Sequence, residues 1–196
     1  MFQVRVHGRG GQGVVTAAEL LSVAAFKGGR FAQAFPNFGS ERTGAPVVSY
    51  CRISDKPIRI REPIIVPDAL VIQDVTLLHS VDLLSGFPQE GYVIVNTNKS
   101  FEDLGLGEFA AAHDPERLVT VSATEIAMRH VGRPLPNAVL LGGLAAMIRE
   151  VSLEDVVEAI SERFREDVAR ANEAGAREAY DHVSSKRKDR AHASTD

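Results

Sequence analysis

The fold is decided by the stretch FQVRVHGRGGQGVVTAAELLSVAAFKGG, residues 2–29. Phe2, Val4 and Val6 alternate with polar residues, a pattern that predicts a short β-strand. After Gly13, apolar residues recur at helical spacing as far as the Gly28-Gly29 pair, which predicts an α-helix. The chain therefore opens with a strand, a glycine-rich turn and a helix.

Strands and helices alternate along the rest of the chain. Short apolar runs predict strands at residues 31–35, 47–53, 56–60, 69–72, 92–95 and 118–121. Helical spacing predicts helices at residues 76–85, 126–131, 137–149, 153–164 and 165–183, with capping signals at Ser122–Glu125 and Ser152–Asp155. Residues 47–53 and 56–60 are expected to pair as a hairpin. We predict an α/β fold with a three-layer Rossmann-like sheet, mostly parallel, and a small antiparallel β insertion near residues 45–61.

The C-terminal residues differ in composition from the rest. Residues 184–196 contain four basic and two acidic residues and no apolar residue larger than alanine. Such a segment cannot offset the entropy of ordering itself. We expect one domain over residues 1–183, followed by a disordered basic tail over residues 184–196.

Composition excludes several classes of protein. The chain has 196 residues, a formal charge of −4 and a single cysteine, Cys51. One cysteine cannot supply a four-cysteine zinc site, an internal disulfide framework or an all-cysteine iron–sulfur cluster. The acidic balance argues against a nucleic-acid partner, and no apolar stretch has the length of a membrane helix. We expect a cytoplasmic protein that binds neither membrane nor nucleic acid.

The glycine-rich turn admits two interpretations from its residues alone. Gly8, Gly10 and Gly13 have the GxGxxG spacing of a dinucleotide-binding turn, in which a helix N-terminus receives a phosphate. The acidic residue that would hold a ribose is missing from residues 28–35. A stand-alone dinucleotide-binding oxidoreductase is therefore one alternative, and a purely structural turn is the other.

Three single residues and one short segment are weaker candidates. His7 before the turn could exchange a proton, but a histidine at a strand end is more often structural. Cys51 lies among apolar neighbours, which favours a small buried hydrophobic residue over a nucleophile. Asp74 and residues 96–98 follow predicted strands, where α/β proteins bind ligands, although Asp also caps helices.

Several motifs in order resemble one protein family. They are GRGGQG followed by Val14-Val15, FPNFGSERTGAPVVSYCRIS at residues 35–54, ATEIA at residues 123–127 and PNAVLLGGLA at residues 136–145. Together they resemble the gamma subunit of 2-oxoacid:ferredoxin oxidoreductases, the pyruvate:ferredoxin oxidoreductase family. The resemblance covers about residues 3–180, and its specific part is the pair GxGGQG and GxExxG.

The resemblance implies a multi-subunit enzyme that oxidatively decarboxylates a 2-oxoacid to its acyl-CoA. It implies alpha, beta and delta subunits as partners, ferredoxin or a related electron acceptor, and thiamine diphosphate, iron–sulfur clusters and coenzyme A in the assembled complex. This chain would bind no cofactor alone, supply no catalytic or metal-ligating residue, be inactive in isolation, and form the coenzyme A side of the active-site wall.

The family's motifs carry over onto a short set of residues on the coenzyme A side or at a subunit interface. These residues are Gly8, Gly10, Gly11, Gln12, Gly13, Gly39, Glu41 and Arg42. Gln12 places an amide at the helix N-terminus, where it could bind a neighbouring loop or a phosphate. Thr43 and Ala45 depart from the family's pattern, so we expect Glu41 and Arg42 to be structural or interfacial residues. The sequence leaves the choice of 2-oxoacid open.

Overall fold

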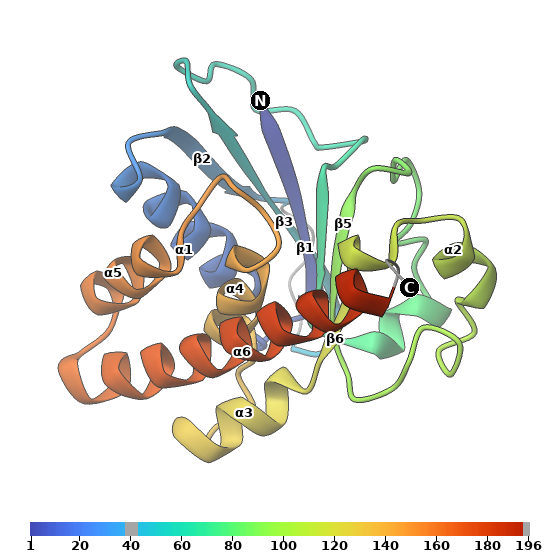
Figure 1. Cartoon of the computed structure of the whole chain (residues 1–196). Coiled ribbons are helices and arrows are strands. Elements are labelled where there is room, and N and C mark those ends of the chain that lie inside the picture. Colours follow the sequence, from blue (N-terminus) through green and yellow to red (C-terminus); the bar gives the residue numbers. More distant parts are fainter. Residues whose placement is uncertain (38–42, 194–196) are drawn as a thin grey trace.

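The computed structural model of this chain describes residues 1–37 and 43–193, with side chains as far as residue 189. Within these residues the strands are β1 (Phe2–Arg9), β2 (Phe31–Pro36), β3 (Pro46–Ser54), β4 (Ala69–Ile72), β5 (Tyr92–Asn96) and β6 (Leu118–Val121). The helices are α1 (Val14–Lys27), α2 (Gly107–Ala111), α3 (Ala123–His130), α4 (Asn137–Ala145), α5 (Leu153–Arg163) and α6 (Glu166–Ala193). Two 3₁₀ turns, η1 (Val75–His79) and η2 (Pro115–Arg117), complete the fold (Figure 1).

The strands form one mixed sheet in the order β2-β3-β1-β4-β5-β6. β1, β4, β5 and β6 are parallel to one another, whereas β3 is antiparallel to both β1 and β2. The predicted α/β class, with a mostly parallel sheet and an antiparallel insertion, is confirmed.

The predicted partner of the antiparallel strand was wrong. Residues 56–60 form no strand, and β3 pairs instead with β2, from Phe31 opposite Ser54 to Pro36 opposite Ser49. Pro57 has no N–H to donate to a neighbouring strand. The carbonyl groups of Ile60 and Glu62 accept hydrogen bonds from the Arg52 guanidinium, so a side chain satisfies them.

Alternation along the central strands gives the sheet two apolar faces. Val71, Ile94 and Val119 belong to the larger core cluster, together with residues of α1, α3, α4, α5 and α6. Leu70, Val93 and neighbouring side chains belong to a second cluster, with residues from η1 and α2. Helical elements therefore cover both faces, unequally, in three layers (Figure 1).

Two arginines are buried on the second face of the sheet, where the sequence pattern suggested a polar side. Arg5 donates to the carbonyl oxygens of Leu83 and Ser85, at 2.8 and 2.9 Å. Arg52 donates to Glu62 in the same manner and lies over the Phe35 ring, 5.0 Å from its centroid. These guanidinium groups hold irregular chain over β1 and β3.

The C-terminal segment differs from the expected disordered tail over residues 184–196. α6 continues to Ala193, and Val183 is fully buried at the proposed boundary. Lys186 donates to the Thr120 carbonyl and Arg187 to the Ala146 carbonyl. The basic side chains thus satisfy main-chain acceptors of neighbouring elements, which corrects the boundary at residue 184; residues 194–196 lie outside the described part. None of the helices in the described ranges is both long and apolar enough to cross a membrane.

The packing of α4 against α6 gives a stability prediction. A Cβ on Gly142 would lie 2.1 Å from the Ala176 carbonyl oxygen of α6. Gly142→Ala should therefore lower the free energy of unfolding by about 1–3 kcal/mol, although alanine is intrinsically the better helix former by about 1 kcal/mol. Urea denaturation of the full chain measures this change.

Gly143→Ala is the matched control in the same helix. Its Cβ would meet the Cδ1 atom of Ile94, the movable end of a side chain, so the loss should be smaller. A Gly142→Ala variant as stable as wild type would contradict the close approach of α4 and α6.

Candidate functional site

The candidate site lies at the carboxyl ends of the parallel strands. The glycine turn follows β1, Asp74 follows the neighbouring strand β4, and Asn96 ends β5. The chain leaves β1 through α1 toward β2, on one side of β1, whereas β4 lies on its other side. Ligands of open α/β sheets bind at such a reversal of strand order.

Glycine is required at three positions of the turn. Gly11 and Gly13 have φ angles of +94° and +74°, a conformation that side chains other than glycine rarely adopt. A Cβ on Gly8 would lie 2.6 Å from Val14 Cγ2, and one on Gly13 would lie 2.6 Å from Asn137 Nδ2. The turn therefore has a single shape, set by backbone conformation and by its neighbours.

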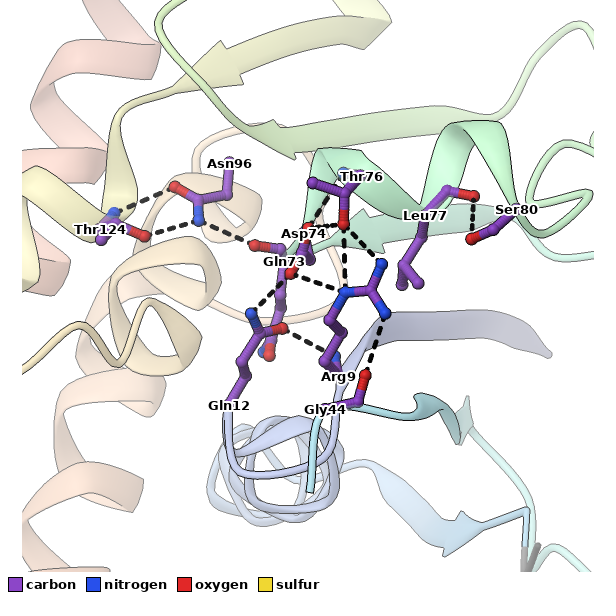
Figure 2. A network of polar contacts seen from close by, with 10 residues as sticks. All are labelled: Arg9, Gln12, Gly44, Gln73, Asp74, Thr76, Leu77, Ser80, Asn96 and Thr124. Carbon is purple, nitrogen blue, oxygen red and sulfur yellow. Dashed lines mark hydrogen bonds and ion pairs between the residues drawn. The ribbon is translucent and has the colours of Figure 1, made fainter. Parts of the chain in front are cut away.

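Gln12 closes the turn and ties it to the end of β4. Its Oε1 accepts from the main-chain N–H of Arg9 at 2.7 Å, and its Nε2 donates to Asp74 Oδ2 at 2.8 Å (Figure 2). Both ends of the amide are engaged within the protein, so Gln12 holds the turn to the end of β4. Of the two roles predicted for this side chain, binding a neighbouring loop is the one that these contacts support.

Arg9 extends the same network to the segment before β3. Its guanidinium donates to the Gly44 carbonyl at 2.9 Å and to Thr76 Oγ1, and it lies 3.3 Å from Asp74 Oδ2. Two main-chain bonds run alongside, from Gly10 N–H to the Ala45 carbonyl and from Gly44 N–H to the Gly10 carbonyl. Figure 2 shows Arg9 between these segments, and its contacts join the turn to residues 44–45.

Asp74 is the negative centre of this network. Burial opposes ionisation of the carboxyl group, but hydrogen bonds from Thr76 and Gln12 and the charge of Arg9 outweigh it, so the pKa of Asp74 lies below its ordinary value. The strand before Asp74 is the parallel neighbour of β1 on the side away from β2, whereas dinucleotide-binding folds carry their ribose-binding acid on the strand that follows the first helix. Asp74 is therefore not the counterpart of that acid, and protein donors occupy its carboxylate.

Asn96 joins the third strand to this edge. Its Nδ2 donates to the Gln73 carbonyl and to Thr124 Oγ1, and its Oδ1 accepts from the Thr124 N–H (Figure 2). Asn96 therefore caps α3, and the predicted side-chain cap from Ser122 does not form. Ser152 and Asp155 do form a capping box at α5.

The N-terminus of α1 presents unused hydrogen-bond donors. Gly13 is the N-cap and supplies no side chain, and the main-chain N–H groups of Val14, Val15 and Thr16 have no acceptor among the described residues. Two cavities flank the turn, one of about 470 Å³ on the side of α4 and α6 and one of about 320 Å³ on the side of β3. Gly11 and Gly13 line both cavities.

The other predicted positions divide into three groups. Gly39, Glu41 and Arg42 fall outside the described residues. His7 is buried and lines neither cavity beside the turn; burial and then the charge of Arg5 lower its pKa to about 4. Cys51 is fully buried in the apolar core, where burial raises the pKa of its thiol, so it is a core residue as predicted.

Sequence reasoning missed Arg9 and Asn137. Arg9 occupies a variable position of the GxGxxG pattern, which carries no signal for a side-chain role. Asn137 stood inside the PNAVLLGGLA motif, yet its position beside Gly13 arises from tertiary packing. Among the described side chains, those of residues 1–37 and 43–189, no three metal-ligating groups come together in a way that would hold a metal ion.

The network gives a pH-dependent prediction. Asp74→Asn should lower the free energy of unfolding at pH 7 by about 1–3 kcal/mol, because the surrounding donors lose a charged acceptor. The pKa of Asp74 is depressed in the folded state, so its contribution is fully present above the ordinary carboxyl value and disappears as the pH falls through the folded value. The difference between the two proteins should therefore shrink below about pH 4.

Urea denaturation at pH 7, 5 and 3 measures this difference. Asp55→Asn is the control, because Asp55 is 81% exposed and forms only a surface ion pair with Arg30. A stability gap for Asp74→Asn that stays constant across the pH range would contradict the network's dependence on the carboxylate.

Comparison with known proteins identifies the family. The sequence model of the family described as pyruvate ferredoxin/flavodoxin oxidoreductase matches residues 3–182. The chain is 48% identical over 160 residues to pyruvate synthase subunit PorC of Methanosarcina barkeri, covering 82% of this chain and 85% of that protein. It is 46% identical over 181 residues to the common gamma subunit of the pyruvate/ketoisovalerate oxidoreductases of Pyrococcus furiosus, covering 92% and 96%.

A solved structure has the same fold. The pyruvate oxidoreductase subunit PORC of Thermotoga maritima superimposes with a TM-score of 0.76 at 34% identity, covering 92% of this chain and 95% of that one. Sequence, fold and the glycine turn thus agree, and the chain belongs to the pyruvate ferredoxin/flavodoxin oxidoreductase family.

Proposed function

We propose that this chain is the gamma subunit of a multi-subunit oxidoreductase that converts pyruvate or another 2-oxoacid to its acyl-CoA, with ferredoxin or a related protein as electron acceptor. The observation that carries the proposal is the family match over nearly the whole chain, joined to a glycine turn that is fixed in shape. Relatives that it matches over more than nine-tenths of its length are named as gamma subunits.

The residues of this chain do not fit an iron–sulfur cluster of its own. An all-cysteine cluster needs several accessible thiolates, and the one cysteine of the sequence is enclosed in the core. Decarboxylation on thiamine diphosphate and electron transfer through clusters therefore belong, in our proposal, to the alpha, beta and delta partners. This chain contributes architecture and one wall of the path used by coenzyme A.

The glycine turn is the part of that wall that we assign to this chain. Gly8, Gly10, Gly11 and Gly13 bring the backbone close to the edge of the sheet, and the free N–H groups of α1 favour a negative group there. Gln12 positions the turn through Asp74 and does not itself act on the ligand. Gly39, Glu41 and Arg42 are proposed to complete this side of the site or the contact with a partner subunit.

A pair of glycine substitutions tests this assignment in the assembled enzyme. Gly11 has a positive φ, lines both cavities, and has no atom within 4 Å of an added Cβ. Gly11→Ala should therefore strain the turn without a steric clash and displace its N–H groups. We expect the KM for coenzyme A to rise roughly tenfold while kcat at saturating coenzyme A changes little.

Gly29→Ala is the matched control. Gly29 also has a positive φ, +78°, and no atom within 4 Å of an added Cβ, but it lies at the opposite end of α1. Both variants should lose similar stability, and only Gly11→Ala should change the KM. If the two variants had the same KM for coenzyme A, the turn would have only a structural role, and its proposed place in the coenzyme A path would be refuted.

A further inference from the structure

The 56–66 segment, which connects β3 to β4, has no role in the proposed function. The sequence predicts a strand at residues 56–60, where isoleucine and arginine alternate, yet the segment belongs to no strand of the sheet. Residues 57–61 nevertheless run without a turn or a bend. The segment therefore resembles a strand in sequence and in course, but it has no pairing partner among the described residues.

Carbonyl groups of the segment bind side chains of the sheet. Arg52 of β3 donates to the carbonyl oxygens of Ile60 and Glu62, at 3.3 and 2.6 Å. Arg5 of β1 donates to the carbonyl oxygen of Ile65 at 3.4 Å. The segment is thus held against the second face of the sheet before any partner binds, and this lowers the entropy that binding would cost.

Main-chain groups on the other side of the segment are unused. The N–H groups of residues 58–62 donate to no main-chain acceptor among the residues that the structure describes. In an extended chain, successive residues direct their main-chain groups to opposite sides, so Arg59 and Arg61 direct theirs away from Arg52. A row of unpaired N–H and C=O groups is a template for pairing with a strand of another chain.

Apolar side chains are exposed along the same segment. Ile60, Ile65 and Val66 are 46%, 70% and 54% exposed, and they make up three of the eight large apolar residues that are exposed on the described surface. Exposed apolar side chains that gather in one place mark interaction surfaces. The segment therefore offers a partner both main-chain hydrogen bonds and apolar contacts.

The charge of the segment indicates what kind of partner fits it. Lys56, Arg59 and Arg61 are exposed and form no ion pair with any residue in the described ranges. Glu62 is the one acidic residue in the sequence of the segment. Because opposite charges on paired strands stabilise the pairing, these side chains favour a partner strand that carries carboxylates.

The same charges argue against a second copy of this chain as the partner. Ile58 and Ile60 alternate with Arg59 and Arg61. An antiparallel pairing of two copies that sets isoleucine opposite isoleucine also sets arginine opposite arginine. Like charges in directly opposed positions destabilise a pair of strands.

We infer that residues 58–62 form a β-strand with an extended segment of a partner subunit, in which acidic side chains alternate with apolar ones. The partner's carboxylates pair with Arg59 and Arg61, and its apolar side chains cover the exposed isoleucines. The surface itself is independent of the proposed function. Only the identification of the partner as a subunit of the same oxidoreductase rests on that function.

Hydrogen exchange, measured by mass spectrometry, tests the strand directly by comparing the full-length chain alone with the complex purified from its host. The amides of residues 58–62 should exchange at least about tenfold more slowly in the complex, because pairing protects them. Unchanged exchange on assembly would overturn the inference. Protection in the lone chain that rises with its concentration would assign the surface to a second copy and overturn the acidic partner.

Charge reversal tests the chemistry of the partner. Arg59→Glu/Arg61→Glu should raise at least about tenfold the concentration at which half of the chain dissociates from the complex on dilution, as followed by native mass spectrometry. Arg59→Lys/Arg61→Lys, which keeps both charges, should retain most of the wild-type affinity. Arg165→Glu/Lys188→Glu, which reverses two exposed charges elsewhere, is the matched control and should leave the affinity unchanged.

The outcomes separate this surface from the proposed function. All the substituted side chains are exposed, so each variant alone should melt at the wild-type temperature, and the comparison reports binding. Equal affinity of wild type and Arg59→Glu/Arg61→Glu would overturn the surface and leave the gamma-subunit proposal standing. A wild-type chain that retains no partner subunit would overturn both.

Discussion

The Gln12 side chain, together with Arg9, joins the three segments on which the rest of the site depends. Its oxygen accepts from the Arg9 N–H inside the turn, and its nitrogen donates to Asp74 at the end of β4. Asp74 in turn accepts from Thr76 and lies beside Arg9, which reaches Gly44. One amide therefore fixes the turn to the neighbouring strand and, through Arg9, to the segment before β3. Gly11 and Gly13 adopt their positive φ angles without strain, because glycine has no Cβ.

This arrangement explains why a GxGxxG turn need not bind a dinucleotide. In that fold the strand after the first helix ends in an acid that is free to bind a ribose. Here the strand after α1 is β2, which carries no acid and pairs antiparallel with β3 at the edge of the sheet. Asp74 follows β4 on the other side of β1, and its two oxygens are taken by Gln12, Thr76 and Arg9. The same glycine spacing therefore forms a turn that is held by contacts with Gln12, Asp74 and Arg9 and that leaves the N–H groups at the N-terminus of α1 unused.

Local signals in the sequence predicted the fold well where one segment determines its own structure. The alternation of Phe2, Val4 and Val6, the glycine turn and the Ser152–Asp155 cap all form as expected. The mistakes lie where tertiary contacts decide. Residues 56–60 form no strand, and the Ile60 carbonyl accepts a hydrogen bond from Arg52 instead. The end of α6 is ordered because Lys186 and Arg187 donate hydrogen bonds to the carbonyl groups of Thr120 and Ala146. At the site, the glycines were predictable from spacing, but the contact between Gln12 and Asp74 joins residues 62 positions apart, and Asn137 is 124 positions from Gly13.

In the proposed complex this chain supplies binding geometry and its partners supply the redox chemistry. Cys51 is buried in the core and cannot ligate a cluster, whereas the glycine turn lies at the edge of the sheet, where a ligand can reach it. Purification of the tagged chain from its host, followed by native mass spectrometry and analysis of bound iron and thiamine diphosphate, tests it most directly. The account predicts co-purification with larger chains that carry the clusters and the thiamine cofactor. A lone, monodisperse chain that retains no partner under gentle conditions would contradict it.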